Sequence, residues 1–139
     1  MTKTLKALSL AALLCLFISS FSACKKEDEG LLPNITFKLG GDYTAGNVTV
    51  AKSANVKIGI NASKAEDKDV LTKFTIVRAY DNGADSTIFS KDLSGSEGDN
   101  YSYDLNTTTR SVAGTEKYTF TVVNRDGLIN KASLTLTVN

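Results

Sequence analysis

The chain has 139 residues, with 16 Lys and Arg against 15 Asp and Glu, so its net charge is close to zero. A near-neutral chain without a basic cluster lacks the electrostatic signature of a nucleic-acid-binding protein, and we expect no nucleic-acid partner. There is no His and no Trp, and the two Cys are Cys15 and Cys24. Without His, the Ser-His and Cys-His arrangements of nucleophilic catalysis are excluded, and typical zinc sites lose most of their donors.

The first 23 residues have the pattern of an export signal. Lys3 and Lys6 are the only charges before Cys24, and residues 7–21 are apolar or small. That stretch is shorter than the roughly 20 residues of a membrane-spanning helix and suits the apolar part of a signal peptide. The run Phe21-Ser22-Ala23-Cys24 resembles the lipobox of bacterial lipoproteins. The resemblance implies removal of residues 1–23 and lipidation of Cys24; an uncleaved membrane anchor is the alternative.

Residues 24–30 would then be the lipidated Cys and a charged tether. Each buried methylene of an acyl chain contributes about 0.8 kcal/mol, so two or more chains attach a protein stably to a membrane. The residues Lys26, Glu27, Asp28 and Glu29 resemble the signal that sends lipoproteins of the Bacteroidota phylum to the outer face of the outer membrane. The resemblance implies a lipid-anchored outer-membrane protein exposed at the cell surface. A plain solvated tether is the alternative interpretation.

From Leu31 the apolar residues recur with period two, which is typical of half-buried strands. In the first of these strands, Ile35, Phe37 and Leu39 are expected to face inward. Asp81-Asn82-Gly83 and Asn124–Gly127 have the composition of hairpin turns, and in the first of them Asn82-Gly83 is expected to supply the positive φ angles. Ile88 is the clearest apolar contact of the strand that follows the first turn. The expected strands are 34–39, 48–50, 55–61, 71–80, 86–93, 101–105, 117–122 and 131–138.

Seven or eight short strands with frequent turn signals, and no segment of helical period, predict one all-β domain over residues 31–139. Residues 101–139 resemble small immunoglobulin-like domains of Bacteroidota lipoproteins and the last strands of PKD- and cadherin-like modules. The resemblance implies an immunoglobulin-like antiparallel β-sandwich, with Tyr118 placed like the tyrosine-corner residue of that fold. No disulfide can form in the domain because Cys15 lies in the signal. The expected core is Phe37, Val56, Ile58, Ile60, Phe74, Ile76, Tyr118, Phe120, Val122, Leu134 and Leu136.

Chemistry-bearing residues are sparse in this domain. A glycosidase-like carboxylate pair could only come from Asp67, Asp69, Glu97 and Asp99, and a small sandwich offers little cleft. The loop oxygens of Asp67, Asp69, Asp81 and Asn82 could hold calcium, but they lack EF-hand spacing and read better as solvated turns. We therefore expect no enzyme activity, no cofactor and no metal.

The remaining hypothesis is binding. Tyr43, Tyr101 and Tyr103 could form an aromatic platform for a glycan or protein ligand, with Asp42 and Asp99 as polar neighbours, at loops on one end of the sandwich. Asp85-Ser86-Thr87 resembles the sequon for O-glycosylation in Bacteroidota, which implies a sugar on Ser86. Two function classes stay open: a surface binding or adhesion module, and an accessory or structural lipoprotein that docks to an outer-membrane protein complex.

Overall fold

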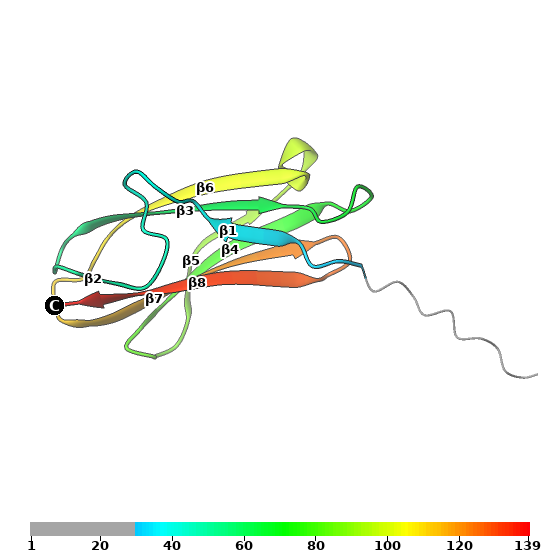
Figure 1. The fold of residues 1–139 in the computed structure, drawn as a ribbon. Coiled ribbons are helices and arrows are strands. Elements are labelled where there is room, and N and C mark those ends of the chain that lie inside the picture. Colours follow the sequence, from blue (N-terminus) through cyan, green and yellow to red (C-terminus); the bar gives the residue numbers. More distant parts are fainter. Residues whose placement is uncertain (1–29) are drawn as a thin grey trace, which may run out of the picture.

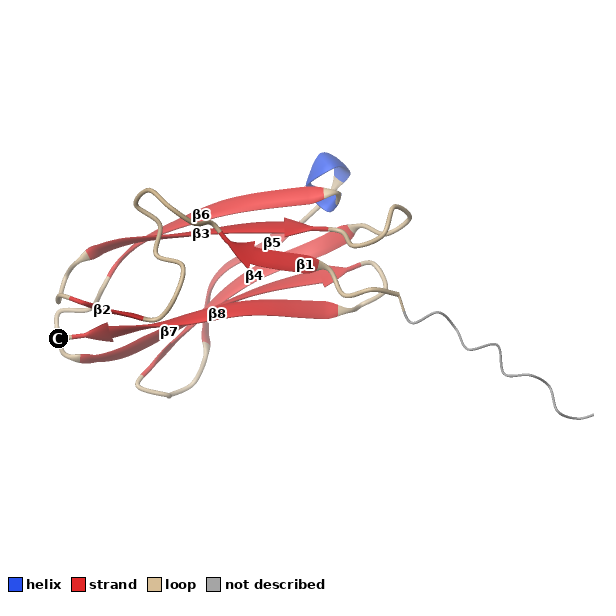
Figure 2. Ribbon diagram, viewed as in Figure 1, coloured by secondary structure: helices blue, strands red, loops and turns tan. Residues whose placement is uncertain are grey.

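The computed structural model describes residues 30–139; the predicted signal peptide, Cys24 and Lys26–Glu29 lie outside this range. Eight strands form two stacked sheets, and one short 3-10 helix, η1, lies between the fifth and sixth strands (Figures 1 and 2). Within residues 30–139 no helix has the length and apolar character needed to cross a membrane. The elements are β1 (Asn34–Phe37), β2 (Val48–Val50), β3 (Asn55–Ser63), β4 (Leu71–Tyr80), β5 (Ser86–Asp92), η1 (Gly95–Gly98), β6 (Asn100–Thr108), β7 (Gly114–Asn124) and β8 (Ile129–Val138).

The strand order is that of an immunoglobulin-like sandwich. One sheet has the order β1-β3-β6 and the other β2-β8-β7-β4-β5, which matches strands A-B-E facing G-F-C with an added C′ strand. The predicted fold class is confirmed. One pairing is parallel, that of β2 with β8, because residues 38–47 carry the chain from the small sheet to the large one. Between β5 and β6 the chain forms η1 and no further strand, so no strand from this segment pairs with β6.

The core lies between the sheets and consists of the inward-facing residues of each strand. Ten of the eleven predicted core residues are buried, and the eleventh, Phe37, is partly buried with its ring edge-on to Phe120 at 5.8 Å. Ile88 also packs against this core. Leu39 was expected to face inward, and this prediction is wrong: its side chain is 81% exposed. The reason is that β1 ends at Phe37 and the chain turns away at Gly40 and Gly41, which both have positive φ.

Tyr118 is completely buried, as a tyrosine-corner residue would be, but its hydroxyl has a different partner. The hydroxyl donates to Oε2 of Glu116 at 2.7 Å, and Oε1 of the same carboxylate accepts the backbone N–H of Arg110 at 2.7 Å. Burial raises the pKa of Tyr118, so the hydroxyl keeps its proton and remains a donor. In immunoglobulin-like domains the tyrosine reaches the backbone directly. Here the buried carboxylate of Glu116 connects Tyr118 to the β6–β7 connection.

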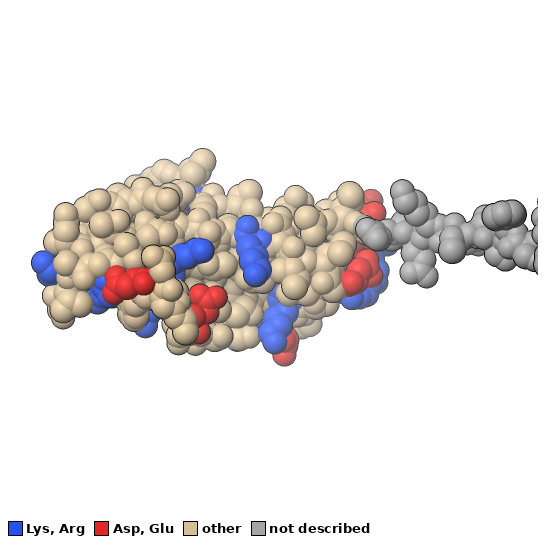
Figure 3. Space-filling model, turned by 90° about the horizontal axis from the view of Figure 1, so that it is seen from below, with Lys and Arg blue, Asp and Glu red and all other residues tan. Residues whose placement is uncertain are grey.

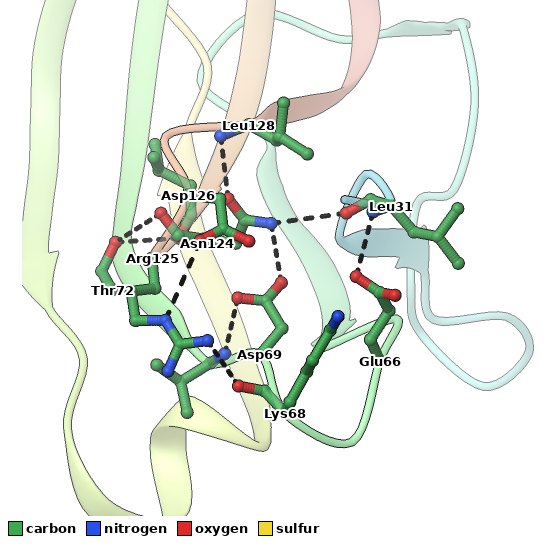
Figure 4. Close-up of polar contacts among 11 residues, drawn as sticks. Leu31, Glu66, Lys68, Asp69, Thr72, Asn124, Arg125, Asp126 and Leu128 are labelled. Atoms are coloured by element: carbon green, nitrogen blue, oxygen red, sulfur yellow. Dashed lines mark hydrogen bonds and ion pairs between the residues drawn. The ribbon is translucent and has the colours of Figure 1, made fainter. Parts of the chain in front are cut away.

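The end of the sandwich at which the described chain begins is held by a buried polar pair (Figure 4). Asn124 donates to Oδ2 of Asp69 at 2.7 Å and to the carbonyl of Leu31 at 3.3 Å. Asn124 also accepts the N–H of Leu128 at 2.8 Å, inside the β7–β8 hairpin. Asp69, considered above for calcium and for acid-base chemistry, is 1% exposed and therefore acts here as a structural group. The pair fixes the chain entry beside the β3–β4 loop and the β7–β8 hairpin.

The opposite end contains the turn after β4. The turn lies at Asp81-Asn82-Gly83 as predicted, but the two residues with positive φ are Asp81 (51°) and Asn82 (60°), and not Asn82 and Gly83. Asp81 adopts positive φ because its carboxylate accepts hydrogen bonds from both terminal nitrogens of Arg110 at 2.6 Å and from the N–H of Thr115 at 2.8 Å. The Arg110 hydrogen bonds are the main reason that the pKa of Asp81 falls from 3.8 to about 2.

The shifted pKa makes the stability contribution of Asp81 dependent on pH. A carboxyl group with a lowered folded-state pKa stabilises the protein above its unfolded pKa of about 3.9 and loses that contribution as the pH falls through the folded value. We expect Asp81→Asn, which tolerates positive φ, to be less stable than wild type at pH 7. The difference should disappear between about pH 4 and pH 2. Urea unfolding of both proteins across this range measures it, and a difference that stays constant down to pH 2 would contradict the assignment.

Candidate functional site

The five predicted ligand-binding residues do not form one site in the structure. Tyr101 and Tyr103 share one face of β6, as their spacing indicates, but that face is the core. Tyr101 is 7% exposed with its ring centroid 5.1 Å from that of Phe74, and the ring of Tyr103 lies 4.4 Å from that of Phe89. The prediction that these two tyrosines form an exposed stacking platform is therefore wrong. The register of β6 against β3 places its odd-numbered residues inward.

Asp99 does not join Tyr43 either. It lies just before β6 and its carboxylate pairs with Lys64 at 2.7 Å. Glu97, another carboxylate considered for acid-base chemistry, pairs with Lys91. Both acidic residues therefore pair with nearby lysines, and neither contacts Tyr43, whose hydroxyl bonds to Asp104 instead. Within residues 30–139 no group of three His, Cys, Asp or Glu side chains is placed to hold a metal ion.

Tyr43 and Asp42 do lie together, in an ion-pair network on the outer face of the three-stranded sheet. The Tyr43 hydroxyl donates to Oδ2 of Asp104 at 2.8 Å, and Nζ of Lys38 lies 2.5 Å from Oδ1 of the same carboxylate. The Lys38 hydrogen bond, followed by that of Tyr43, lowers the pKa of Asp104. Nζ of Lys57 lies 4.6 Å from the Tyr43 ring centroid and 3.5 Å from Oδ1 of Asp42. The two lysines and two aspartates balance, so the network carries no net charge.

Gly59 of β3 makes room for this network. A Cβ atom built there would lie 2.5 Å from Cε1 of Tyr43 and 2.6 Å from Cδ of Lys38. Such distances are far inside van der Waals contact, so the ring of Tyr43 and the stem of Lys38 cover the sheet where it has no side chain. The ring is therefore held against the sheet and is only partly exposed. Lys38, Lys57, Gly59 and Asp104 were not predicted from the sequence.

On one side of the network the outer face of the same sheet carries rows of short polar side chains. The strand register aligns Asn34 with Ser63 and Asn100, and Thr36 with Asn61 and Ser102. These side chains are neighbours in fact: Ser102 donates to Oδ1 of Asn61 at 3.1 Å, and Asn34 donates to Oγ of Ser63 at 3.4 Å. We call these six residues the amide face. They line an open hollow of about 440 Å³.

A second hollow, of about 450 Å³, lies on the other side of the network, lined in part by Asn55, Lys57, Asn106 and Thr108. Asn is disfavoured in strands because it competes for backbone hydrogen bonds and packs poorly on a pleated surface. Five outward Asn in a three-stranded sheet therefore have a cost in strand propensity without a gain in packing. Amide and hydroxyl groups both donate and accept hydrogen bonds, so the arrangement suits an uncharged ligand rich in hydroxyl or peptide groups. These outward Asn, Ser and Thr residues could have been found from the sequence, because they are the polar residues of the period-two alternation in the three strands.

The opposite face of the sandwich is different. Its large sheet presents Thr pairs such as Thr75 with Thr121 and Thr115 with Thr137. Figure 3, which views the molecule from the side where β7 and β8 lie in Figure 1, shows basic and acidic side chains scattered over this surface without a continuous patch of one sign. Ser86, the predicted glycosylation residue, is exposed at the start of β5.

The contact between Gly59 and Tyr43 can be tested by a double-mutant cycle. We expect Gly59→Ala to destabilise the wild-type protein by about 1–3 kcal/mol because the new methyl group displaces the ring. In a Tyr43→Ala background the same change should cost clearly less, because only the flexible stem of Lys38 then has to move and Ala is otherwise preferred to Gly inside a strand. Urea unfolding of the four proteins gives the coupling energy. Additive effects of the two substitutions would show that the ring does not rest on Gly59.

Comparison with known proteins gives information on the fold of this chain and none on a ligand. No protein-family model matches the chain, and no curated protein is similar to it in sequence. Among solved structures, the chain is similar to a superoxide reductase (neelaredoxin) from Ignicoccus hospitalis, with a TM-score of 0.51, 6% identity, and coverage of 78% of this chain and 81% of that one. Weaker similarities include murine CRIg (TM-score 0.42, 14% identity, coverage 77% and 96%). Another is the sporulation control protein Spo0M from Bacillus subtilis (TM-score 0.46, 12% identity, coverage 78% and 50%). At these identities the likeness concerns the β-sandwich fold alone.

Proposed function

We propose that this chain is a lipid-anchored, non-catalytic binding module that presents the amide face to a glycan or protein at the bacterial cell surface. The observation that carries the proposal is the alignment of Asn, Ser and Thr side chains across β1, β3 and β6 over an open hollow. Such a surface offers many hydrogen-bond donors and acceptors on a rigid sheet, and it offers no evident nucleophile or acid-base pair. Rigid presentation reduces the entropy that is lost on binding.

The position of the chain entry supports an orientation for this surface. Five residues lie between Cys24 and Gly30, and the six Cα–Cα steps of such a segment span at most about 22 Å when fully extended. Gly30 lies beside the β3–β4 loop and the β7–β8 hairpin, where a Cβ atom on it would be 3.2 Å from Oδ2 of Asp126. With a lipid on Cys24, that end of the sandwich would stay near the membrane. The sheet faces would then stand beside the anchor and be accessible from the side.

The anchoring half of the proposal has its own experiment. Replacement of Cys24 by Ser should abolish lipidation, so we expect the variant to lose its lipid-dependent membrane attachment and to keep residues 1–23 uncleaved. Cell fractionation with N-terminal sequencing measures both. A Cys24→Ser protein that stays fully membrane-bound and still loses residues 1–23 would contradict the lipid anchor. Protease shaving of intact cells, with Lys26–Glu29 changed to Ala as the comparison, tests surface display, and full protection of the wild-type protein would place it in the periplasm.

The binding half is tested by side-chain removal on matched faces. A glycan array and an envelope-protein pull-down with the purified protein identify the ligand. We expect Asn34→Ala with Asn61→Ala to weaken its binding by about fivefold to thirtyfold, the equivalent of one or two lost hydrogen bonds. The control is Thr119→Ala with Ser133→Ala, a cross-strand pair on the outer face of the other sheet. Equal binding by the two double variants would remove the amide face from the proposal.

The alternative function, an accessory lipoprotein docked to an outer-membrane complex, predicts a different outcome of the same screen. It is favoured by the peptide-compatible chemistry of the amide face, since amide side chains pair with backbone groups as readily as with sugar hydroxyls. In that case the pull-down would recover one outer-membrane protein in stoichiometric amount and the glycan array would be blank. A glycan signal that is lost in the Asn34 and Asn61 variants would support the first function.

A further inference from the structure

The two sheets have four edge strands, and three of them are protected against pairing with another chain. Natural sheets blunt their edges with short strands, bulges, charges or Pro, because an open edge is a template for an added strand. Two of the edges, β1 and β2, have only four and three residues. The pairing of β5 with β4 is interrupted by a bulge between Ile76 and Val77, and β5 ends in the charged residues Lys91 and Asp92.

The fourth edge, β6, has none of these protections. It runs for nine residues and pairs with β3 in an unbroken register from Asn100 to Thr108. It contains no Pro and no basic residue, and its one charge, Asp104, is already neutralised by Lys38. In Figure 1, β6 forms the margin of the upper layer and no strand lies beyond it. The strand that pairs with this edge in many immunoglobulin-like domains, strand D of the A-B-E-D sheet, has no counterpart among residues 30–139.

The hydrogen bonds at the two ends of the β3–β6 ladder show which backbone groups are free. Lys64 donates to the carbonyl of Asp99, and Thr109 donates to the carbonyl of Ala54. Antiparallel ladders alternate between residues that bond inward to the partner and residues whose N–H and C=O point away. The odd-numbered residues of β6 therefore bond to β3. The even-numbered residues between them, Asn100 to Thr108, direct their N–H and C=O groups to the open side.

The side of the sandwich at this edge also offers an apolar seam. Tyr103 on β6 and Phe89 on β5 contact each other across the two sheets, with ring centroids 4.4 Å apart. Both are only partly buried, as are Ile88 and Leu105. A strand added beside β6 would place every second side chain over this seam and the alternate ones beside Ser102, Asp104 and Asn106. The geometry therefore selects a segment in which apolar residues alternate with small polar ones.

We propose that β6 binds an extended segment of a partner protein, which adds to the three-stranded sheet as its fourth strand. This deepens the proposed function, on which it rests for the choice of partner. Two copies of the chain pairing through β6 about a two-fold axis would run antiparallel and place their chain entries at opposite ends. With a tether of at most about 22 Å, two such copies could not both stand with that end against one membrane. A different protein, free to approach from the side, meets no such constraint.

The test uses the full-length protein purified in detergent and a synthetic nonapeptide of alternating Thr and Val with a Lys at each end. A peptide of the same composition, with Thr and Val in separate blocks, is the control. Amide hydrogen exchange is followed residue by residue by NMR. We expect the N–H groups of Ser102, Asp104 and Asn106 to exchange rapidly in the free protein and to become protected by the alternating peptide only. The N–H groups of Tyr101, Tyr103 and Leu105 should be protected in both states.

Two substitutions separate main-chain from side-chain binding. Ser102→Pro removes one outward N–H from the open edge and should raise the Kd of the peptide by about fivefold or more. Ser102→Ala loses only the hydroxyl and keeps that N–H, so it should bind the peptide more tightly than Ser102→Pro. Melting temperatures establish that both variants are folded. Should Ser102→Pro fail to fold, the exchange measurements on the wild-type protein decide alone.

Four results would each overturn the inference. They are outward amides that are already protected in the free protein at low concentration, absence of protection with the alternating peptide, equal protection by the block peptide, and equal affinity of the folded Ser102→Pro variant. Protection that grows with protein concentration in the absence of peptide would show that a second copy is the occupant instead. None of these outcomes depends on Cys24 or on the side chains of Asn34 and Asn61, so a failure here is distinguishable from a failure of the proposed function.

Discussion

An aromatic layer between the two sheets takes the place of the disulfide and Trp that join the sheets of antibody domains. Phe74 lies at its centre, with its ring centroid between 5.1 and 6.4 Å from those of Phe89, Tyr101, Tyr103 and Phe120. These residues come from β4, β5, β6 and β7, so the layer connects both sheets. Aromatic pairs at such distances contribute about 0.5–1.5 kcal/mol each beyond their buried area. No cross-link among residues 30–139 can substitute for them, since this range contains no Cys.

This layer also determines what the outer surface can be. With Tyr101 and Tyr103 committed to the core, the outward residues of β6 are short and polar, and together with β1 and β3 they make the amide face. The remaining exposed tyrosine of the predicted platform, Tyr43, is held by Asp104 and lies over Gly59. The small sheet therefore offers a ligand hydrogen-bonding amides and hydroxyls, with a fixed ion-pair network between two hollows. It offers little aromatic surface for stacking.

Much of the fold could be predicted from the sequence because period-two alternation is a strong signal for half-buried strands. All eight strands occur where it placed them, with differences of a few residues at their ends. In β6 the alternation separates Tyr101, Tyr103 and Leu105 from Ser102, Asp104 and Asn106, and it therefore indicates that the tyrosines face inward. The prediction of Tyr101 and Tyr103 as ligand contacts is wrong because it rests on residue type, and tyrosine is common both in cores and at binding surfaces. The prediction that Leu39 faces inward is wrong for a different reason, because the alternation continues in the sequence beyond Phe37, the last residue of β1.

The candidate site was less predictable because its members are distant in sequence and chemically ordinary. Lys38, Lys57 and Asp104 meet only after β1, β3 and β6 have paired, and nothing in their local sequences marks them. Gly59 interrupts a strand, which usually indicates a bulge or a close approach, and here it is a close approach by Tyr43. The positive φ angles of the Asp81 turn lie one residue earlier than expected because Arg110, 29 positions away, supplies two hydrogen bonds that local turn preferences do not include.

The central claim is that the small sheet, and not the large one, is the surface that meets a partner. Site-specific photocrosslinking in intact cells tests it most directly. A photoreactive phenylalanine derivative is placed at Asn61, in the middle of the amide face, or at Thr119, on the outer face of the large sheet. We expect a discrete crosslinked species from position 61 and none from position 119. A discrete species from position 119 alone would show that the large sheet, and not the small one, meets the partner.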